Sequence, residues 1–354
     1  MKPFATLSAG AGLALSSALL FGASTPLTKL LLGQGLDPLL LASLLYLGSG
    51  AGLGLLLLGR RAVHAQRSEA PLSRRDIPWL ALVVLFGGVA GPVLMMLGLT
   101  SVHASAASLL LNLESVSTLV IAWLVFHESV DRRLLFGAGA ILGGALILSW
   151  GGQVSGFGWG AVLIVAACLA WGIDNNLTRK ISAGDPVQIA CVKGLAAGIV
   201  NLGLAMAHGA LLPGLGLLLA AALVGFVGYG ASLVMFVRAL RQIGTARTGA
   251  YYAIAPFFGA LLAVVLLGEP FTLQLLFAGI MMAIGLYLHL AEQHEHEHSH
   301  DAMHHEHSHV HDEHHRHAHE PSDPPGEPHL HAHRHGAMIH SHRHFPDIHH
   351  RHPH

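Results

Sequence analysis

The chain has 354 residues, of which 53% are hydrophobic and only 11% are charged. A soluble domain carries roughly 25% charged residues. This composition excludes a soluble enzyme, a secreted disulfide scaffold and a nucleic-acid-binding protein. The polar residues are also unevenly distributed, because residues 292–354 hold 24 of the 29 histidines and 11 of the 20 acidic residues. We therefore expect an all-α polytopic membrane protein with a histidine-rich tail.

Ten apolar runs are long enough to cross a bilayer as helices, which need roughly 20 residues each. They lie at residues 7–28, 38–59, 77–99, 105–126, 134–150, 158–178, 186–207, 215–237, 248–267 and 273–291. With the N-terminus inside, thirteen basic residues of the connecting segments are cytoplasmic and only Lys29 is not. This bias predicts a multi-pass protein of the inner (plasma) membrane with both termini in the cytoplasm.

Parts of the sequence recur at nearly constant spacing. Residues 21–29 match residues 171–179 at a spacing of 150, and residues 126–128 match residues 267–269 at a spacing of 141. Spans one to five and six to ten are therefore two copies of one unit, which cross the membrane in opposite orientation because five is odd. Such an inverted repeat is typical of alternating-access carriers. The predicted domains are the first repeat (1–150), the second repeat (151–291) and the tail (292–354).

The two copies share a short motif at matching places, Val-Phe-His-Glu at 125–128 and Leu-Leu-Gly-Glu at 266–269. With the five-plus-five repeat, it makes residues 1–291 resemble the EamA-type drug/metabolite transporter superfamily. Residues 111–114, 173–180 and 244–251 are similar to one branch of that superfamily. Some members of this branch carry histidine-rich tails and are associated with nickel and cobalt resistance. The resemblance implies a transporter and not an enzyme.

Glu114 lies near the centre of the fourth span, where a carboxylate is costly in free energy. Burial disfavours its ionised form, so the group can exchange protons near neutral pH. We expect it to couple transport to protons or to bind a cation, with Asn112 as a supplementary oxygen ligand. The alternative is a neutral structural carboxyl held by a hydrogen bond, for instance to Asn112.

Asp174 and Lys193 fall at similar depth on two consecutive antiparallel spans. They are either a structural ion pair, in which each charge makes the other tolerable in the membrane, or part of the transport pathway. In the second case Asn175 and Asn176 are neutral oxygen ligands beside them.

Other polar residues lie at the ends of the spans. Glu128 and Glu269 fall at turns between helices and are expected to act as caps or gates more than as ligands. His103 is expected to be an interfacial side chain. Asp37 and Asp185, each followed by proline, are predicted N-caps of the next helix.

The tail has no apolar period, so we expect it to be disordered. Neutral imidazole is a common ligand of borderline divalent metals, and a flexible chain can bring three or four rings around one ion. We therefore expect the tail to bind Ni²⁺, Co²⁺ or Zn²⁺, although no cofactor is required. The first expected ligands are His294, His296, His298, His300, His304, His305, His307, His309 and His311.

Two functions are compatible with this pattern. The first is proton-coupled export of divalent metal cations, with the tail collecting ions at the cytoplasmic mouth. The second is export of a small organic metabolite or amino acid, with the tail as a metal buffer or sensor. A membrane-anchored metal store needs no ten-span core. The sequence contains no ATP-binding loop, so the proton gradient or the membrane potential supplies the energy. The expected partners are metal cations, protons and the lipid bilayer, and the sequence is compatible with a homodimer.

Overall fold

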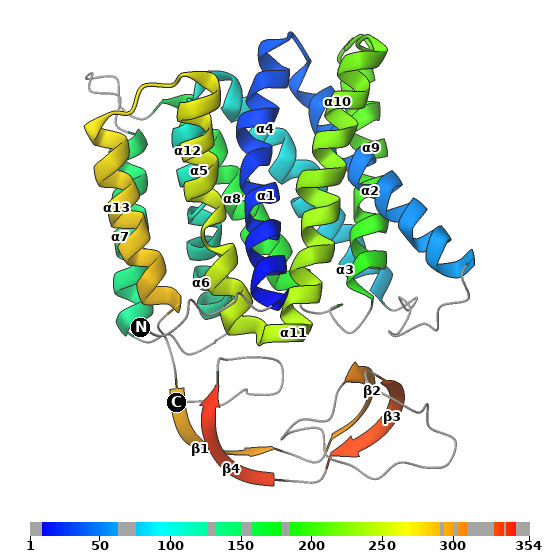
Figure 1. Ribbon diagram of the computed structural model, residues 1–354, viewed down its shortest axis with the longest axis vertical. Coiled ribbons are helices and arrows are strands. Elements are labelled where there is room, and N and C mark those ends of the chain that lie inside the picture. The colour runs from blue at the N-terminus through cyan, green and yellow to red at the C-terminus, as the bar shows by residue number, and fades with distance from the viewer. Residues whose placement is uncertain are drawn as a thin grey trace, which may run out of the picture.

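The structure is a computed structural model. It describes residues 9–62, 76–126, 132–149, 158–178, 181, 185–290, 294–300, 303–309, 329–335 and 338–344. The described residues between 9 and 290 are mostly helical, and the helices stand side by side in a bundle (Figure 1). They are α1 (Ala9–Gly33), α2 (Pro38–Ala62), α3 (Ile77–Val83), α4 (Gly91–Ser101), α5 (Ala104–Leu110), α6 (Leu113–Phe126), α7 (Arg132–Ser149), α8 (Trp159–Thr178), α9 (Pro186–Ala207), α10 (Leu215–Gly225), α11 (Ser232–Tyr252), α12 (Ala255–Leu267) and α13 (Leu273–Leu290). Two π-helical turns, η2 (Val84–Ala90) and η4 (Phe226–Ala231), interrupt this series.

Eight helical segments among the described residues are long and apolar enough to cross a membrane. Two shorter apolar helices, Ala255–Leu267 and Leu273–Leu288, follow them in the chain. The protein is therefore a multi-pass membrane protein with a helical membrane part. The count of ten spans stays a prediction, because it needs the two shorter helices to cross as well.

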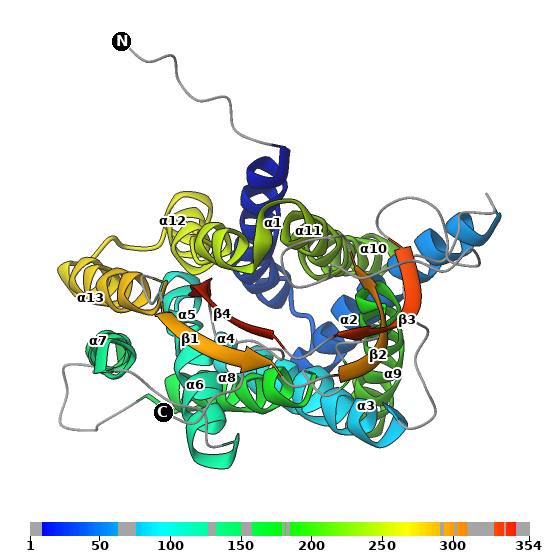
Figure 2. The same ribbon diagram turned by 90° about the horizontal axis from the view of Figure 1, so that it is seen from below.

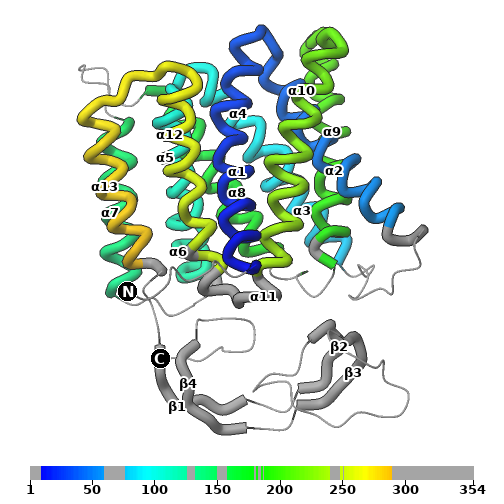
Figure 3. Tube along the Cα trace, viewed as in Figure 1, coloured from blue at the N-terminus to red at the C-terminus, as the bar shows by residue number. Residues whose placement is uncertain are grey.

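The contacts between helices are symmetric. A contact from a helix of the first half to the second half has a counterpart from the equivalent helix of the second half to the first. α1 packs against α11 and α12, and α8 packs correspondingly against α4 and α6. α2 packs against α9, α5 against α12, and α7 against α13. Seen from below, α7 and α13 lie together at one side of the molecule, away from α2 and α9 (Figure 2). The same arrangement is visible along the chain trace (Figure 3).

The first helices of the two halves run in opposite directions. Lys29, near the end of α1, hydrogen-bonds to the carbonyl oxygen of Leu99 in α4. Gly160, at the start of α8, packs beside Gly98, because a Cβ on Gly98 would lie 2.7 Å from the Gly160 carbonyl oxygen. The end of α1 and the start of α8 therefore meet at the same face of the bundle, as an inverted repeat requires.

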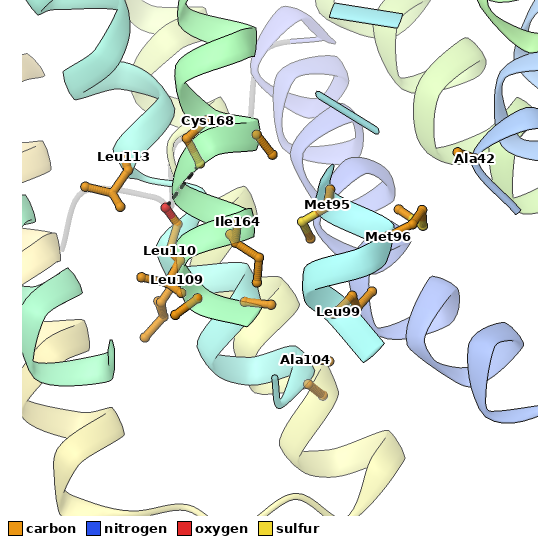
Figure 4. Packing of buried hydrophobic residues seen from close by; sticks show 14 of the residues in the cluster. Ala42, Met95, Met96, Leu99, Ala104, Leu109, Leu110, Leu113, Ile164 and Cys168 are labelled. Atoms are coloured by element: carbon orange, nitrogen blue, oxygen red, sulfur yellow. Dashed lines mark hydrogen bonds between the residues drawn. The ribbon is translucent and has the colours of Figure 1, made fainter. Parts of the chain in front are cut away.

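Buried apolar side chains fill the contact between α5 and α8. Leu109, Leu110, Ile164 and Cys168 are buried where α5 meets α8, and the Cys168 thiol lies 3.6 Å from the Leu110 carbonyl oxygen (Figure 4). Closely approaching backbones are common in membrane bundles, where van der Waals packing holds helices together.

The two predicted N-caps are confirmed. The Asp37 carboxylate accepts a hydrogen bond from the backbone N–H of Leu40 at 3.0 Å. The Asp185 carboxylate accepts one from the N–H of Val187 at 2.9 Å. In both cases the side chain satisfies a backbone donor that has no partner within its helix.

The tail contains strands where disorder is expected from its composition. They are β1 (His294–His300), β2 (Met303–His309), β3 (His329–His335) and β4 (Met338–His344). β1 pairs antiparallel with β4, and β2 pairs antiparallel with β3. Histidine alternates with other residues in these segments, and a period of two is the period of a β-strand. The expectation of disorder rested on the absence of apolar periodicity, and for the tail as a whole it stays a prediction.

Candidate functional site

A cavity of about 340 Å³ lies between the two halves of the bundle. Its lining comes from α1, α2, α4, α6, α8, α9, η4 and α11, so both repeats contribute. The polar groups among its lining residues include Glu114, Asn175 and Lys193. Its aromatic residues are Phe21, Tyr46, Trp171, Tyr229, Phe236 and Tyr252.

Five of these aromatic rings form a continuous chain along the cavity. Tyr46 and Tyr229 have ring centroids 5.9 Å apart, and Tyr229 meets Phe21 edge to face, also at 5.9 Å. Phe21 then contacts Tyr252 at 5.5 Å, and Tyr252 contacts Phe236 at 4.8 Å. These separations are typical of stabilising aromatic pairs. This aromatic wall is not apparent from the sequence, because the rings come from four separate elements and share no local spacing.

Glu114 lies in the first turn of α6, directly after the break that separates α5 from α6. Its Oε1 accepts a hydrogen bond from Nδ2 of Asn175 at 2.9 Å. The same amide lies 3.1 Å from the Thr118 hydroxyl. Glu114 also borders a second cavity, of about 500 Å³, between α6, α8 and α12. The carboxyl is thus within reach of two spaces and has a neutral hydrogen-bond donor beside it.

Asn112 does not hold Glu114, contrary to the alternative considered above. Its Nδ2 donates to the carbonyl oxygen of Leu109 at 2.8 Å and lies 3.9 Å from the Met282 sulfur. The physical reason is the position of Asn112 at the helix break. Its backbone N–H also donates to the Leu109 carbonyl oxygen, at 3.1 Å, so the side chain turns back onto the end of α5 and not toward Glu114.

Asp174 and Lys193 are brought together. Their Oδ2 and Nζ atoms form an ion pair between α8 and α9, and the Thr178 hydroxyl lies 3.2 Å from Asp174 Oδ1. The Asp174 side chain is 6% exposed and that of Lys193 is 21% exposed, so the lysine is the member that reaches the cavity. Gly87 of η2 packs against this pair, and a Cβ at that position would collide with Asp174 Oδ2.

The π-helical turn η2 supports the site from one side. The carbonyl oxygen of Gly87 accepts hydrogen bonds from the Tyr46 hydroxyl at 2.7 Å and from the Trp171 indole N–H at 3.2 Å. Asn201 donates to the neighbouring carbonyl of Gly88 at 2.9 Å. π-helical turns often occur at functional sites. Here three side chains from α2, α8 and α9 converge on backbone acceptors of the turn.

Asn175 and Asn176 have different surroundings although they are adjacent. Asn175 is exposed and lies at the Glu114 carboxyl. Asn176 is buried, and its Nδ2 donates to the carbonyl oxygens of Gly172 at 2.9 Å and Thr118 at 3.1 Å. Only Asn175 therefore has the position that a ligand of a transported solute needs.

The structure describes two of the three polar residues expected at the ends of the spans, Glu269 and His103. Glu269 caps α5, which belongs to the other half of the chain, since its two carboxylate oxygens accept the N–H groups of Ala104 and Ser105. His103 is 68% exposed and lies 3.7 Å from Glu269. Glu128 lies outside the described residues.

Among the described residues, no three His, Cys, Asp or Glu side chains lie together as a metal site. Of the nine histidines predicted first as metal ligands, eight lie in β1 and β2. His311 lies outside the described residues.

Sequences of the EamA-like transporter family match this chain at residues 8–150 and again at residues 158–291. The chain belongs to the EamA-like transporter family. An uncharacterized transporter of Methanothermobacter thermautotrophicus is 29% identical over 289 residues, which cover 77% of this chain and 84% of that protein. The uncharacterized inner membrane transporter YedA of Escherichia coli K12 is 26% identical over 187 residues, 49% of this chain and 61% of the relative.

A crystal structure of another protein has a similar fold, with a TM-score of 0.57 and 18% sequence identity. The match covers 80% of this chain and 96% of that one. Family membership makes this EamA-like protein a membrane transporter, and its cavity between the halves is therefore the candidate passage for the solute.

The buried ion pair generates a prediction about folding. We expect D174N and K193M each to lower the amount of folded protein, because each leaves one buried charge without its partner, at a cost of about 3–5 kcal/mol. The double variant D174N/K193M should recover most of this loss. The measurement is the midpoint of thermal unfolding in detergent.

Normal stability of both single variants, together with loss of transport, would contradict the structural role. It would assign the pair to the transport pathway instead.

Proposed function

We propose that the chain exports divalent metal cations of the nickel and cobalt class across the inner membrane in exchange for protons. The cavity between the halves opens alternately to the two sides. The choice of metal is supported by the register of the paired strands in the histidine-rich tail. The histidine pairs on facing strands are His294 with His344, His296 with His342, His298 with His340, His305 with His333, His307 with His331 and His309 with His329.

This register puts histidines opposite histidines on one face of each strand pair. Directly opposite residues of antiparallel strands have Cβ atoms about 4.5–5.5 Å apart. Residues two apart on a strand share a face. Two neighbouring histidine pairs therefore occupy adjacent register positions of paired strands, and imidazole suits Ni²⁺, Co²⁺ and Zn²⁺. With the C-terminus in the cytoplasm, the tail would collect ions on the side from which they are exported.

Glu114 is the residue we assign to proton coupling. Asp174 is already neutralised by Lys193, whereas the hydrogen bond to Glu114 comes from a neutral amide. A carboxyl that alternately holds a proton or a cation can link the movements of the two. Asn175 and backbone carbonyl oxygens would complete the oxygen ligands of the ion.

The aromatic wall favours a second candidate, the export of a small organic amine or amino acid. A cationic ammonium group is attracted to aromatic faces, and Glu114 would supply its counter-ion. In that case the tail buffers or senses metal. Growth on amino acids and toxic amines distinguishes this candidate from metal export.

We expect E114Q cells to have normal amounts of the protein in the membrane but to lose nickel and cobalt resistance. The substitution keeps shape and a hydrogen-bonding group but removes the proton exchange. E114D should keep partial resistance with a shifted pH optimum. The measurement is growth of cells with and without the gene on nickel, cobalt, zinc and copper salts, and on amino acids and toxic amines.

Protection against organic compounds alone would contradict metal export and support the second candidate. Full metal resistance in E114Q cells would show that the coupling site lies elsewhere.

The register of the tail predicts a difference between two adjacent histidines. His305 is opposite His333, whereas His304 lies on the other face and is opposite Arg334. In purified full-length protein whose β1 carries H294A, H296A and H298A, we expect H305A to weaken Ni²⁺ binding at least tenfold. H304A should change it less than twofold. Isothermal titration calorimetry measures both, and equal effects of the two variants would mean that histidine content alone determines binding.

A further inference from the structure

One end of the cavity is sealed in this structure. Ser24 and Thr25 of α1 and Met95 of α4 are among the cavity-lining residues. About one turn further along these helices, Lys29 and Leu99 are joined by a hydrogen bond, and Leu99 is completely buried. Asn175, in contrast, is exposed. The cavity is therefore closed at the Lys29 face, which the charge bias predicts to be the outer one.

The turn between α4 and α5 forms part of this closed end, and it is held from two sides. Lys29 donates to the carbonyl oxygens of Leu99 and Val102, the latter at 2.9 Å. Glu269 accepts the N–H groups of Ala104 at 2.7 Å and Ser105 at 2.8 Å. A cation thus binds the carbonyl end of α4, and an anion binds the N–H end of α5, as the helix dipoles favour.

Lys29 belongs to the first half of the chain, as does the turn itself, whereas Glu269 belongs to the second half. It follows Gly268, which ends α12 in the left-handed conformation (φ 65°), and its side chain is 7% exposed. The contact therefore joins the two halves across the closed end of the cavity. An opening that separates the halves at this contact would break both hydrogen bonds to Glu269.

The second repeat also turns at the matching segment. At the spacing of 141, Ala104 and Ser105 correspond to Thr245 and Ala246. These two residues lie within α11 (Ser232–Tyr252), which folds back on itself, because the rings of Phe236 and Tyr252, 16 residues apart, lie only 4.8 Å from each other. Both copies therefore reverse direction here, and Glu269 caps the helix that follows the turn of the first copy.

We propose that Glu269 is a gating residue of the transport cycle. Its carboxylate keeps the Lys29 face closed by holding the first N–H groups of α5, and it releases them when this face opens. Glu269 does not touch the solute, so its role is to position α5. The inference deepens the proposed function by naming a gate, but it depends only on alternating access and not on the identity of the solute.

The test measures access to the cavity and needs no solute. A single cysteine is introduced as M95C after C168A and C191A have removed the two native cysteines. A membrane-impermeant thiol reagent is then applied from each side, to spheroplasts and to inverted membrane vesicles. We expect M95C to react from the Asn175 side, and at most slowly from the Lys29 side.

E269Q should raise the rate of reaction from the Lys29 side at least fivefold, because an amide cannot accept two N–H groups as a carboxylate does. K29M should act in the same direction, since it frees the carbonyl side of the turn. H103A is the matched control, since His103 lies beside Glu269 but is exposed, and it should leave the rate within twofold.

Unchanged rates in folded E269Q and K29M proteins would overturn the gate and leave Glu269 as a static helix cap. An equal increase in H103A would overturn it as well, because the effect would then be a general loosening of this face. Failure of E269Q to fold would leave K29M as the deciding variant. Metal export itself could fail its own test without changing any of these outcomes.

Discussion

A bilayer interior has no water to satisfy exposed backbone groups, so each interruption of a membrane helix needs partners within the protein. This constraint shapes the site. Carbonyl oxygens of the π-helical turn η2 accept hydrogen bonds from Tyr46, Trp171 and Asn201. At the break before α6, Asn112 donates both its backbone and its side-chain N–H to the Leu109 carbonyl oxygen. The helix interruptions and the polar side chains therefore lie together, around the cavity.

The buried charged residues also need partners within the protein, and each finds a different kind of partner. Asp174 and Lys193 neutralise each other against Gly87, and a buried pair of this kind is costly to break. Glu114 has Asn175 as its hydrogen-bond donor and borders two cavities. A change in the protonation of Glu114, as proposed, would therefore leave no ion-pair partner behind. Glu269, in turn, uses its charge on backbone N–H groups at the closed end of the cavity.

Local patterns of the sequence predicted much of the fold. Apolar run lengths located the helices, Asp-Pro pairs located two caps, and similar depth on neighbouring spans brought Asp174 to Lys193. Features that depend on distant segments were not predictable in this way. The aromatic wall, the partner of Glu114 and the helix that Glu269 caps each join elements far apart in the chain.

The histidine-rich tail shows a different limit of prediction from the sequence. Its strands follow from an alternation of histidine with other residues, which a search for apolar periodicity does not detect. The histidine register then appears only when strands near the start of the tail pair with strands near its end. Composition alone predicts metal affinity, whereas the register predicts which histidines act together.

The central claim is that metal and proton exchange through Glu114. Purified protein in liposomes, with a pH gradient as the only driving force, tests it most directly. We predict that wild-type protein moves radioactive nickel against its concentration gradient while protons flow the opposite way, and that E114Q does neither. Nickel movement that is unaffected by the pH gradient, or that is equal in E114Q, would contradict the account.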